Sequence, residues 1–437
     1  MGGHWCVAAK LALLTRSMKN IASIILAAGE GTRMKSSIPK VLHCICGKPM
    51  IQYLLDNAVS LGIKNNIIVI GHGADLVKER LDSVKCVKQN KLLGTGDAVL
   101  RARDILLKDN KVDNVLVLYG DTPLLTKGTI KKLIDKHLST KAGCTILTSQ
   151  LKNPTGYGRI KRLDNNKIIK IIEELDADIY EKAIEEINVG VYCFNKKALF
   201  DAIEKIRPDN EKEEYYLTDT IEILSKSNMP VDSVATDDPE EFLGVNTRAD
   251  LAKAELIMRH RILDNVMRSG VTVTDPDNTY IEENARIGED TIIYPYTFIE
   301  NDVKIGAGCS IGPFARVRSG SKVSDNAEIG NFVEIVRSSI GERTKVKHHA
   351  YIGDTVIGKD VNVGAGTIVA NYDGKTKHKT IIEDNAFIGT GAILIAPVKI
   401  GKSAVIGAGA VVTKNKNVPQ GKTVVGVPAR ILNNKIK

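Results

Sequence analysis

The stretch IGAGCSIGPFARVRSGSKVSDNAEIGNFVEI, residues 305–335, carries a branched aliphatic residue at every sixth position. A helix repeats every 3.6 residues and a hairpin sheet every two, so neither gives this spacing. A parallel β-helix does, because each of its short strands sends one aliphatic side chain inward. This stretch therefore predicts a β-helix.

The repeat extends beyond these residues on both sides. It comprises 22 units between Ile281 and Val412, with one interruption, NYDGKTKHKT, at residues 371–380. Glycine follows the aliphatic residue in 11 of the 22 units, which suits corners where a side chain would crowd the turn. Burial of each Ile or Val contributes roughly 1.5–3 kcal/mol, so the stack supplies its own core.

The repeat alone leaves the role of this domain, residues 271–437, open. It could be a structural prism that organises oligomers, because a fold does not fix a function. The interruption favours a ligand site instead, since a loop that projects from a rigid prism offers a wall for one. Sustained repeats of this kind also resemble the left-handed β-helix acyltransferases.

Residues 18–246 show a different pattern, in which buried strands alternate with helices. Strands are expected for IASIILAAG (21–29), NNIIVIGHG (65–73), NVLVLYGD (114–121) and GCTILTSQL (143–151), and helices for PMIQYLLDNAVSLG (49–62) and GDAVLRARDILL (96–107). Continuous β-branched runs between helices predict a parallel sheet covered on both faces.

A glycine-rich loop and a carboxylate follow two of these strands. The loop LAAGEGTRMKSSIPK, residues 26–40, lacks the ending of a Walker loop, and Met34 replaces the third glycine of a dinucleotide fingerprint. Parallel sheets bind ligands beyond the carboxyl ends of their strands, so the loop and Asp121 should face one crevice. There Arg33 and Lys40 could neutralise phosphates and Asp121 could bind magnesium.

Each of these two signals also has a structural interpretation. The loop could be a tight turn, and Asp121 could simply favour the turn before a proline. Together they favour phosphoryl or nucleotidyl transfer, in which catalysis is mostly positioning and charge neutralisation.

A helix is expected to connect the two domains. TRADLAKAELIMRHRILDNVMRSG, residues 247–270, opens with Thr247 and Asp250 in the spacing of a capping box and closes on Gly270. Residues 1–17 are interpreted as an extended or non-native N-terminus, because they contain neither an uninterrupted apolar region nor a clear cleavage site. The working chain is expected to begin near Met18.

Composition restricts the partners of the chain. Its 61 Lys and Arg residues against 52 Asp and Glu suit anionic small substrates, and no basic tract interleaved with aromatics predicts nucleic-acid binding. No run approaches the ~18 apolar residues of a membrane helix, so no membrane insertion is expected. Seven scattered cysteines fit a reducing cytoplasm.

A series of motifs then resembles one family in order along residues 18–413. These are LAAGEGTRMKSSIPKVLHCICGKPM, LGTGDA, YGDTPLL, NPTGYGRI, GVN (244–246), IGPFARVR, GNFVE, YIGD, NVGAGT, ANYDG and FIG. They are similar to the bacterial bifunctional N-acetylglucosamine-1-phosphate uridylyltransferases and glucosamine-1-phosphate N-acetyltransferases. The resemblance implies a Rossmann-like nucleotidyltransferase domain joined by a helix to a left-handed β-helix.

The activity that the resemblance implies has two steps. Acetyl-CoA would acetylate glucosamine 1-phosphate, and UTP would then convert the product to UDP-N-acetylglucosamine with release of pyrophosphate. Other readings stay open: a uridylyltransferase whose β-helix is only a trimerisation scaffold, a nucleotidyltransferase for another sugar or base, and a non-catalytic binding protein.

The resemblance also implies a uridylyl site with Mg²⁺ in the first domain. Its residues would be Leu26, Ala27, Ala28 and Gly29 on the nucleotide, Arg33 and Lys40 as catalytic groups on the phosphates, Gln89, Gly94 and Thr95 on uracil, Tyr119 and Gly120 before Asp121, Asp121 and Asn246 on the metal, and Gly158, Glu173 and Asn188 on the N-acetylglucosamine.

A second site is implied in the β-helix, between subunits of a homotrimer. His348 would be the general base, because the ammonium of glucosamine must lose a proton and an imidazole can take it near neutral pH. A surface or packing histidine is the alternative. The remaining residues would be Arg318, Tyr351 and Asn362 on the sugar phosphate, and Ala365, Asn371, Tyr372, Thr390 and Ala408 on acetyl-CoA.

The chain departs from this family at five positions. Leu175 and Val336 stand where lysines are usual, Val189 where threonine is usual, Asp97 where histidine is usual, and Gly426 near an expected arginine.

Overall fold

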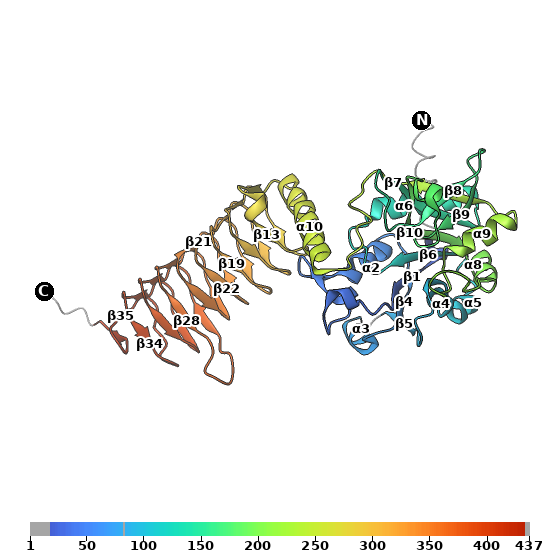
Figure 1. Ribbon diagram of the computed structural model, residues 1–437. Coiled ribbons are helices and arrows are strands. Elements are labelled where there is room, and N and C mark those ends of the chain that lie inside the picture. Colours follow the sequence, from blue (N-terminus) through green and yellow to red (C-terminus); the bar gives the residue numbers. More distant parts are fainter. Residues whose placement is uncertain (1–17, 82–83, 433–437) are drawn as a thin grey trace, which may run out of the picture. The chain divides into compact units, whose positions relative to one another are not determined.

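The computed structural model describes residues 18–81 and 84–432. The interpretation of residues 1–17 and of the start near Met18 lies outside these residues. The chain divides into two compact units, one ending at Ala254 and one beginning at Glu255 (Figure 1).

The first unit is built on a nine-stranded sheet with the order β11-β7-β10-β6-β1-β4-β5, to which β8 and β9 are attached. Its strands are β1 (Ile21–Ala27), β4 (Asn65–Ile70), β5 (Lys85–Lys88), β6 (Asn114–Tyr119), β7 (Cys144–Gln150), β8 (Arg159–Arg162), β9 (Ile168–Ile172), β10 (Glu186–Asn195) and β11 (Val231–Ala235). A two-stranded ribbon of β2 (Cys44–Ile45) and β3 (Lys48–Pro49) accompanies it.

The predicted parallel sheet is not parallel throughout. Strands β6, β1, β4 and β5 are parallel, but β10 runs antiparallel to β6, β7 and β8, and β9 runs antiparallel to β8. The segment EINVGVYCFN has a glycine and polar residues within it, so it lacks the continuous apolar run that marks the other strands.

Helices cover both faces of the sheet. They are α2 (Met50–Ser60), α3 (Ala74–Arg80), α4 (Thr95–Leu100), α5 (Arg103–Lys108), α6 (Lys127–Thr140), α7 (Ile179–Lys182), α8 (Lys196–Ile203) and α9 (Asp219–Lys226). Ile24 of β1 belongs to the core that includes α4 and α8, whereas Ile25 belongs to the core that includes α2 and α6. The helix expected at 96–107 is divided into α4 and α5.

The helix α10 (Arg248–Arg268) begins with the predicted capping box. The N–H of Thr247 donates to Asp250 Oδ2 at 2.8 Å, and the N–H of Asp250 donates to Thr247 Oγ1 at 3.1 Å. Gly270 follows the helix with a φ of 92°, the left-handed conformation of a helix C-terminal glycine. Among the residues described, no helix has the length and apolar character needed to span a bilayer.

The second unit is a left-handed parallel β-helix made of three sheets. The ten-stranded sheet contains β12 (Thr272–Val273), β15 (Ile292–Ile293), β18 (Ser310–Ile311), β21 (Glu328–Asn331), β24 (Lys345–His348), β27 (Asn362–Val363), β30 (Phe387–Ile388), β33 (Val405–Ile406), β35 (Thr423–Val425) and β36 (Arg430–Ile431). The eight-stranded sheet contains β13 (Tyr280–Ile281), β16 (Phe298–Ile299), β19 (Arg316–Val317), β22 (Glu334–Val336), β25 (Tyr351–Gly353), β28 (Ile368–Ala370), β31 (Ile393–Ile395) and β34 (Val411–Val412). The seven-stranded sheet contains β14 (Arg286–Ile287), β17 (Lys304–Ile305), β20 (Lys322–Val323), β23 (Ser339–Ile340), β26 (Thr355–Ile357), β29 (Thr380–Ile382) and β32 (Val398–Ile400).

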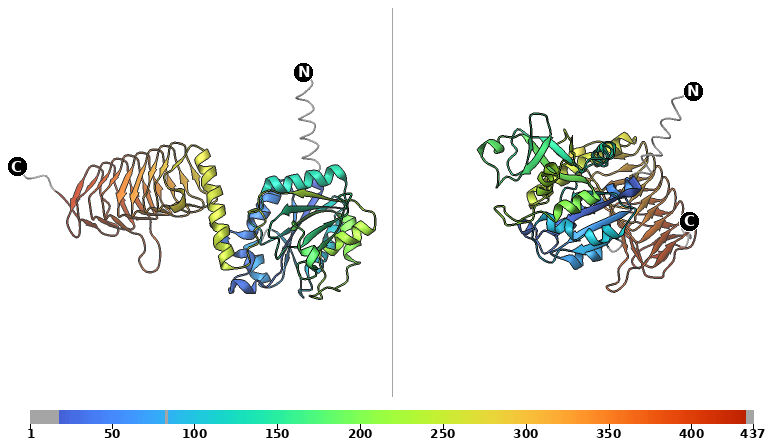
Figure 2. Two further views of the ribbon diagram at one scale, coloured as in Figure 1. Left: turned by 45° about the horizontal axis from the view of Figure 1, so that its top comes forward. Right: turned by 90° about the vertical axis from the view of Figure 1, so that its right-hand side faces the viewer.

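The six-residue repeat forms the core of this unit. Of its 22 aliphatic positions, 21 are buried, and Ile287 is half-buried. From β12 to β31 each strand pairs with the third strand after it, so three repeats complete one coil. Residues 371–379 leave the stack as a loop, as Figure 2 shows.

Candidate active sites

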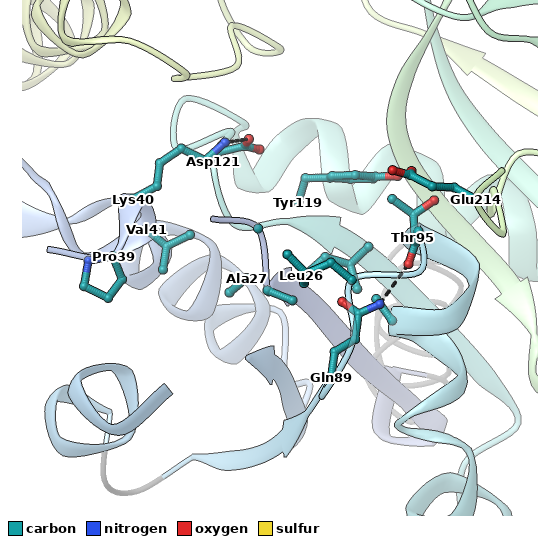
Figure 3. A pocket seen from close by; sticks show the side chains of 15 residues that line it. Leu26, Ala27, Pro39, Lys40, Val41, Gln89, Thr95, Tyr119, Asp121 and Glu214 are labelled. Atoms are coloured by element: carbon teal, nitrogen blue, oxygen red, sulfur yellow. Dashed lines mark hydrogen bonds and ion pairs between the residues drawn. The ribbon is translucent and has the colours of Figure 1, made fainter. Parts of the chain in front are cut away.

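A pocket of about 300 Å³ opens at the carboxyl ends of the parallel strands. Leu26 of β1 pairs with Tyr119 of β6, and β4 flanks β1 on its other side, so the pocket lies where the strand order reverses. Its lining, part of which Figure 3 labels, consists of Leu26, Ala27, Ala28, Gly29, Pro39, Lys40, Val41, Gln89, Leu92, Gly94, Thr95, Ala98, Tyr119, Asp121 and Glu214.

Charged and amide side chains meet around the Lys40 ammonium at one end of this pocket. Lys40 Nζ donates to Asp121 Oδ2 at 2.5 Å and to Asn246 Oδ1 at 3.0 Å. Arg33 donates to the same Asn246 oxygen at 3.0 Å. The N–H of Val245 donates to the carbonyl of Asp121 at 2.9 Å, which holds the GVN segment beside β6. The predicted phosphate and metal residues therefore lie together.

The oxygens of Asp121 and Asn246 suit a magnesium ion. Both are hard donors, and both already face one cation, the Lys40 ammonium. Magnesium is usually bound through one or two protein groups together with waters and substrate phosphates. Over residues 18–81 and 84–432, no cluster of three or more His, Cys, Asp or Glu side chains offers a fuller metal cage.

Gln89, Gly94 and Thr95 form the opposite end of the pocket. Gly94 has a φ of 105°, and a Cβ there would lie 2.6 Å from the carbonyl oxygen of Tyr215, so only glycine fits. Thr95 Oγ1 accepts a hydrogen bond from the N–H of Leu217 at 2.9 Å. The backbone around Tyr215 thus forms the wall at the end of the pocket where the residues expected to contact uracil lie.

The three residues expected to contact the N-acetylglucosamine lie together beside this pocket. The N–H of Asn188 donates to the carbonyl of Gly158 at 2.8 Å, and a Cβ on Gly158 would lie 3.5 Å from a Glu173 oxygen. Burial raises the pKa of Glu173, and Thr218 Oγ1 donates to its carboxylate at 2.9 Å. Burial and then the charge of Glu173 raise the pKa of Tyr119, which places Glu173 near the pocket wall.

The residues predicted for the uridylyl site and the residues that line the pocket overlap only in part. Predicted residues outside the pocket lining are Arg33, Gly120, Gly158, Glu173, Asn188 and Asn246. Lining residues that were not predicted are Pro39, Val41, Leu92, Ala98 and Glu214. Pro39 and Val41 flank Lys40 and could have been inferred from the same loop. Glu214 lies at the pocket because the N–H of Tyr215 donates to the carbonyl of Leu93, a long-range contact that no local sequence pattern predicts.

In the β-helix, five residues occupy equivalent positions on successive coils at one corner. Their separations are 17, 17, 25 and 18 residues, and the long step contains the projecting loop. Strand pairing joins the first two, and main-chain hydrogen bonds from the next coil reach the others. The column consists of Asn331, His348, Ala365, Thr390 and Ala408.

His348 contacts Asn331 through its Nδ1 atom, which lies 2.8 Å from Asn331 Oδ1. This hydrogen bond forms in the tautomer that carries the proton on Nδ1 and leaves Nε2 to accept one. Asn331 was not predicted, although it lies one coil before His348 and the repeat register could have found it.

The neighbouring column at this corner changes from aromatic residues to glycines. The rings of Tyr296, Phe314, Phe332 and His349 stack at centroid distances of 4.9 to 5.1 Å. The column then continues with Gly366, Gly391 and Gly409 in the same left-handed conformation. The loss of side chains begins beside the coil of Ala365, so the corner opens where acetyl-CoA residues were expected.

The predicted sugar-phosphate residues face different sides of the prism. Tyr351 and Asn362 each precede an inward residue and so point outward, but Tyr351 belongs to the eight-stranded sheet and Asn362 to the ten-stranded sheet. Arg318 donates to Glu334 at 3.2 Å, and Glu334 is the strand neighbour of Tyr351. Arg318 and Tyr351 therefore belong to one face of the prism and Asn362 to another.

Residues near the predicted acetyl site already make contacts within the chain. Val336 is buried, and the adjacent Arg337 is paired with Asp354 at 2.7 Å, so Arg337 already has a carboxylate partner. Asn371 donates to the same carboxylate at 2.5 Å, and Tyr372 OH donates to the carbonyl of Gly374 at 2.7 Å.

Comparison with known proteins gives consistent findings for both units. Residues 22–239 match the nucleotidyl transferase family model, and residues 284–319, 302–337 and 379–414 match the model of bacterial transferase hexapeptide repeats. Relatives named Bifunctional protein GlmU include that of Geobacillus sp. (strain WCH70), 46% identical over 90% of this chain and 92% of its own length. Those of Shouchella clausii and Clostridioides difficile are 44% and 40% identical, over 90% and 92% of this chain and 93% and 94% of theirs.

Proposed function

We propose the function of this chain from its family, because the chain belongs to the bifunctional GlmU proteins. It is a bifunctional enzyme that makes UDP-N-acetylglucosamine in two steps. The β-helix transfers the acetyl group of acetyl-CoA to glucosamine 1-phosphate. The first unit then couples N-acetylglucosamine 1-phosphate to UTP and releases pyrophosphate.

The observation that carries the uridylyl assignment is the Lys40 ammonium shared by Asp121 and Asn246 at the switch point of the sheet. A sugar-phosphate oxygen attacks the α-phosphorus of UTP, and the bond to the β-phosphate breaks. Lys40 and Arg33 neutralise phosphate charge, and residues 26–29 position the nucleotide beside them. Magnesium bound at Asp121 and Asn246 would supply further charge neutralisation.

The proposed acetyl transfer uses the column of residues that contains His348. His348 Nε2 takes a proton from the ammonium of glucosamine 1-phosphate, and the free amine attacks the thioester carbon of acetyl-CoA. A C–N bond forms, the nitrogen releases its second proton to solvent, the C–S bond breaks, and His348 returns the proton it holds to the departing thiolate of coenzyme A. Asn331 holds the imidazole in the tautomer that this step needs.

The proposed assembly is a homotrimer. A cytoplasmic location is proposed from the scattered cysteines of the chain. The exposed fractions of Tyr296, Phe314 and Phe332 are 48%, 45% and 50%, and an exposed aromatic row of this kind is typical of an interface. Outward residues on different faces could form one site only if neighbouring chains supply them. Closed cyclic symmetry buries equivalent faces without leaving a growing end.

A pair of variants tests the two assignments when the reactions are assayed separately. Asp121→Ala should abolish pyrophosphate release and leave acetyl transfer largely intact, because the metal residue and the acetyl column belong to different folding units. His348→Ala should lower acetyl transfer by ~10²–10⁴ and leave uridylyl transfer unchanged. His349→Ala is the matched control, since its ring only stacks on Phe332.

Three results would contradict the proposal. Uridylyl transfer by Asp121→Ala at the normal rate would remove Asp121 from the metal site. Greater damage from His349→Ala than from His348→Ala would move the general base. Wild-type chain that uses UTP but transfers no acetyl group would leave the β-helix as a scaffold.

A further inference from the structure

The amide of Gln89 is held by a polar network at the end of the pocket. Gln89 follows β5, its N–H donates to the carbonyl of Ile70 at 2.8 Å, and its exposed fraction is 4%. Its side-chain nitrogen donates to the carbonyl of Gly94 at 3.0 Å and to Asp97 Oδ2 at 2.9 Å. Both hydrogens of the amide are therefore used within the protein.

The chemistry of these partners permits only one orientation of the amide. A carbonyl and an ionised carboxylate accept hydrogen bonds and cannot donate them. Asp97 is 6% exposed, and Arg101 donates to its other oxygen, so both carboxylate oxygens act as acceptors. If the amide were reversed, its oxygen would face two acceptors in a buried place, which is costly.

The amide oxygen of Gln89 is consequently the atom offered to the ligand. Figure 3 shows the nitrogen bonded on the side of Thr95 and the oxygen turned toward Leu26. An acceptor in this place pairs with a base that carries N–H on its ring. Uracil has such a group at N3, whereas cytosine has a bare acceptor there.

We propose that Asp97 is a positioning residue that makes the site selective for uridine over cytidine nucleotides by fixing the amide of Gln89. This inference rests on the proposed function, in which Gln89 contacts the base. Asp97 lies behind the amide and does not line the pocket, so it acts through Gln89. Histidine, usual in the family here, can donate or accept, whereas Asp97 accepts only.

The test compares UTP with CTP as substrates for Asp97→Asn. The asparagine has the same shape but can present an NH₂ group to Gln89, which removes one of the two acceptors that oppose the reversed amide and leaves only the carbonyl of Gly94. We expect the ratio of kcat/KM for UTP to that for CTP to fall about tenfold. The change should lie in KM, because contact with the base is made in the ground state and the transition state alike.

Arg101→Gln is the matched control. It removes the ion pair of Asp97 but leaves both carboxylate oxygens as acceptors, so the UTP-to-CTP ratio should stay within about twofold of wild type. Dissociation constants of UTP and CTP, measured by calorimetry, should show the same pattern without turnover. Thermal unfolding of both variants reports whether the fold is kept.

The possible outcomes separate the inference from the function on which it rests. A folded Asp97→Asn protein with the wild-type ratio overturns the inference, as does an equal loss for both nucleotides, which would indicate a structural role only. A wild-type chain that does not prefer UTP overturns the proposed function itself.

Discussion

Asp219 lies in a crowd of carboxylates at the start of α9. Burial, and then the charges of Asp209, Glu173, Glu222 and Asp176, raise the pKa of its carboxyl from 3.8 to about 6. The folded chain therefore binds this proton more tightly than the unfolded chain does. The ionised form opposes folding above pH 6, and stability is regained as pH falls from 6 toward 3.8.

Asp219→Asn should accordingly stabilise the first unit at pH 7 by about 1–3 kcal/mol, a range that allows for screening of a partly exposed group. The gain should shrink at pH 5, where wild-type Asp219 is mostly protonated. Urea unfolding, followed through the helical circular dichroism signal, measures both. Asp164→Asn is the control, because Asp164 is an exposed carboxylate of the same unit that does not act on Asp219, and its replacement should change stability by less than about 0.5 kcal/mol. An equal gain at both pH values would refute this explanation.

Single residues also show where sequence reasoning stops. Arg33, Lys40, Asp121 and Asn246 could be proposed together because short motifs contain them, and the structure joins them through hydrogen bonds. Glu214 was not foreseen, since only the folded chain brings it to the pocket. Local sequence patterns predict functional residues at strand ends. They do not predict residues that distant segments bring to the pocket wall.

At the scale of elements, repetition decides what can be predicted. The β-helix follows from aliphatic spacing, because every coil obeys the same rule and 21 of 22 positions are buried as expected. The antiparallel β10 and the division of α4 from α5 have no such redundancy. Each depends on contacts with neighbours that the sequence pattern does not contain.

The aromatic-to-glycine column gives a prediction about one corner of the β-helix. Phe332 shows that this corner accepts an aromatic residue at a φ of 55°, and a Cβ on Gly366 would make only ordinary contacts, 3.7 Å from the backbone of Gly391. Gly366→Phe should therefore extend the ring stack and fill the groove beside Ala365. We expect acetyl transfer to fall at least tenfold through a higher KM for acetyl-CoA, with uridylyl transfer unchanged.

Gly421→Phe is the control for this prediction. Gly421 has a φ of 65° and nothing near its Cβ position, but it belongs to a different corner of the prism. It carries the same conformational cost of about 1–2 kcal/mol without filling the groove. Equal losses of acetyl transfer in both variants would show that strain, and not occupation of the groove, is responsible.

At the scale of the whole molecule, the residues proposed for the acetyl site lie on different faces of one prism. Tyr351 and Asn362 point from different sheets of the same prism. A trimer of this 47.5 kDa chain would place one face of each prism against another face of its neighbour. We therefore expect light scattering to give three times the chain mass.

Mixed assemblies test whether neighbouring chains share the site, which mass alone does not. Tyr351→Ala and Asn362→Ala chains should each be nearly inactive in acetyl transfer, because each lacks one sugar-phosphate contact in every site. When the two are co-expressed, a site between chains can take Tyr351 from one and Asn362 from the other. Random mixing should restore about a quarter of the sites in a closed ring of shared interfaces. Uridylyl transfer, which uses the other unit, should stay constant and normalise the comparison. A mixture no more active than its two parents would place both residues in sites within single chains, and the exposed aromatic column would then need another explanation.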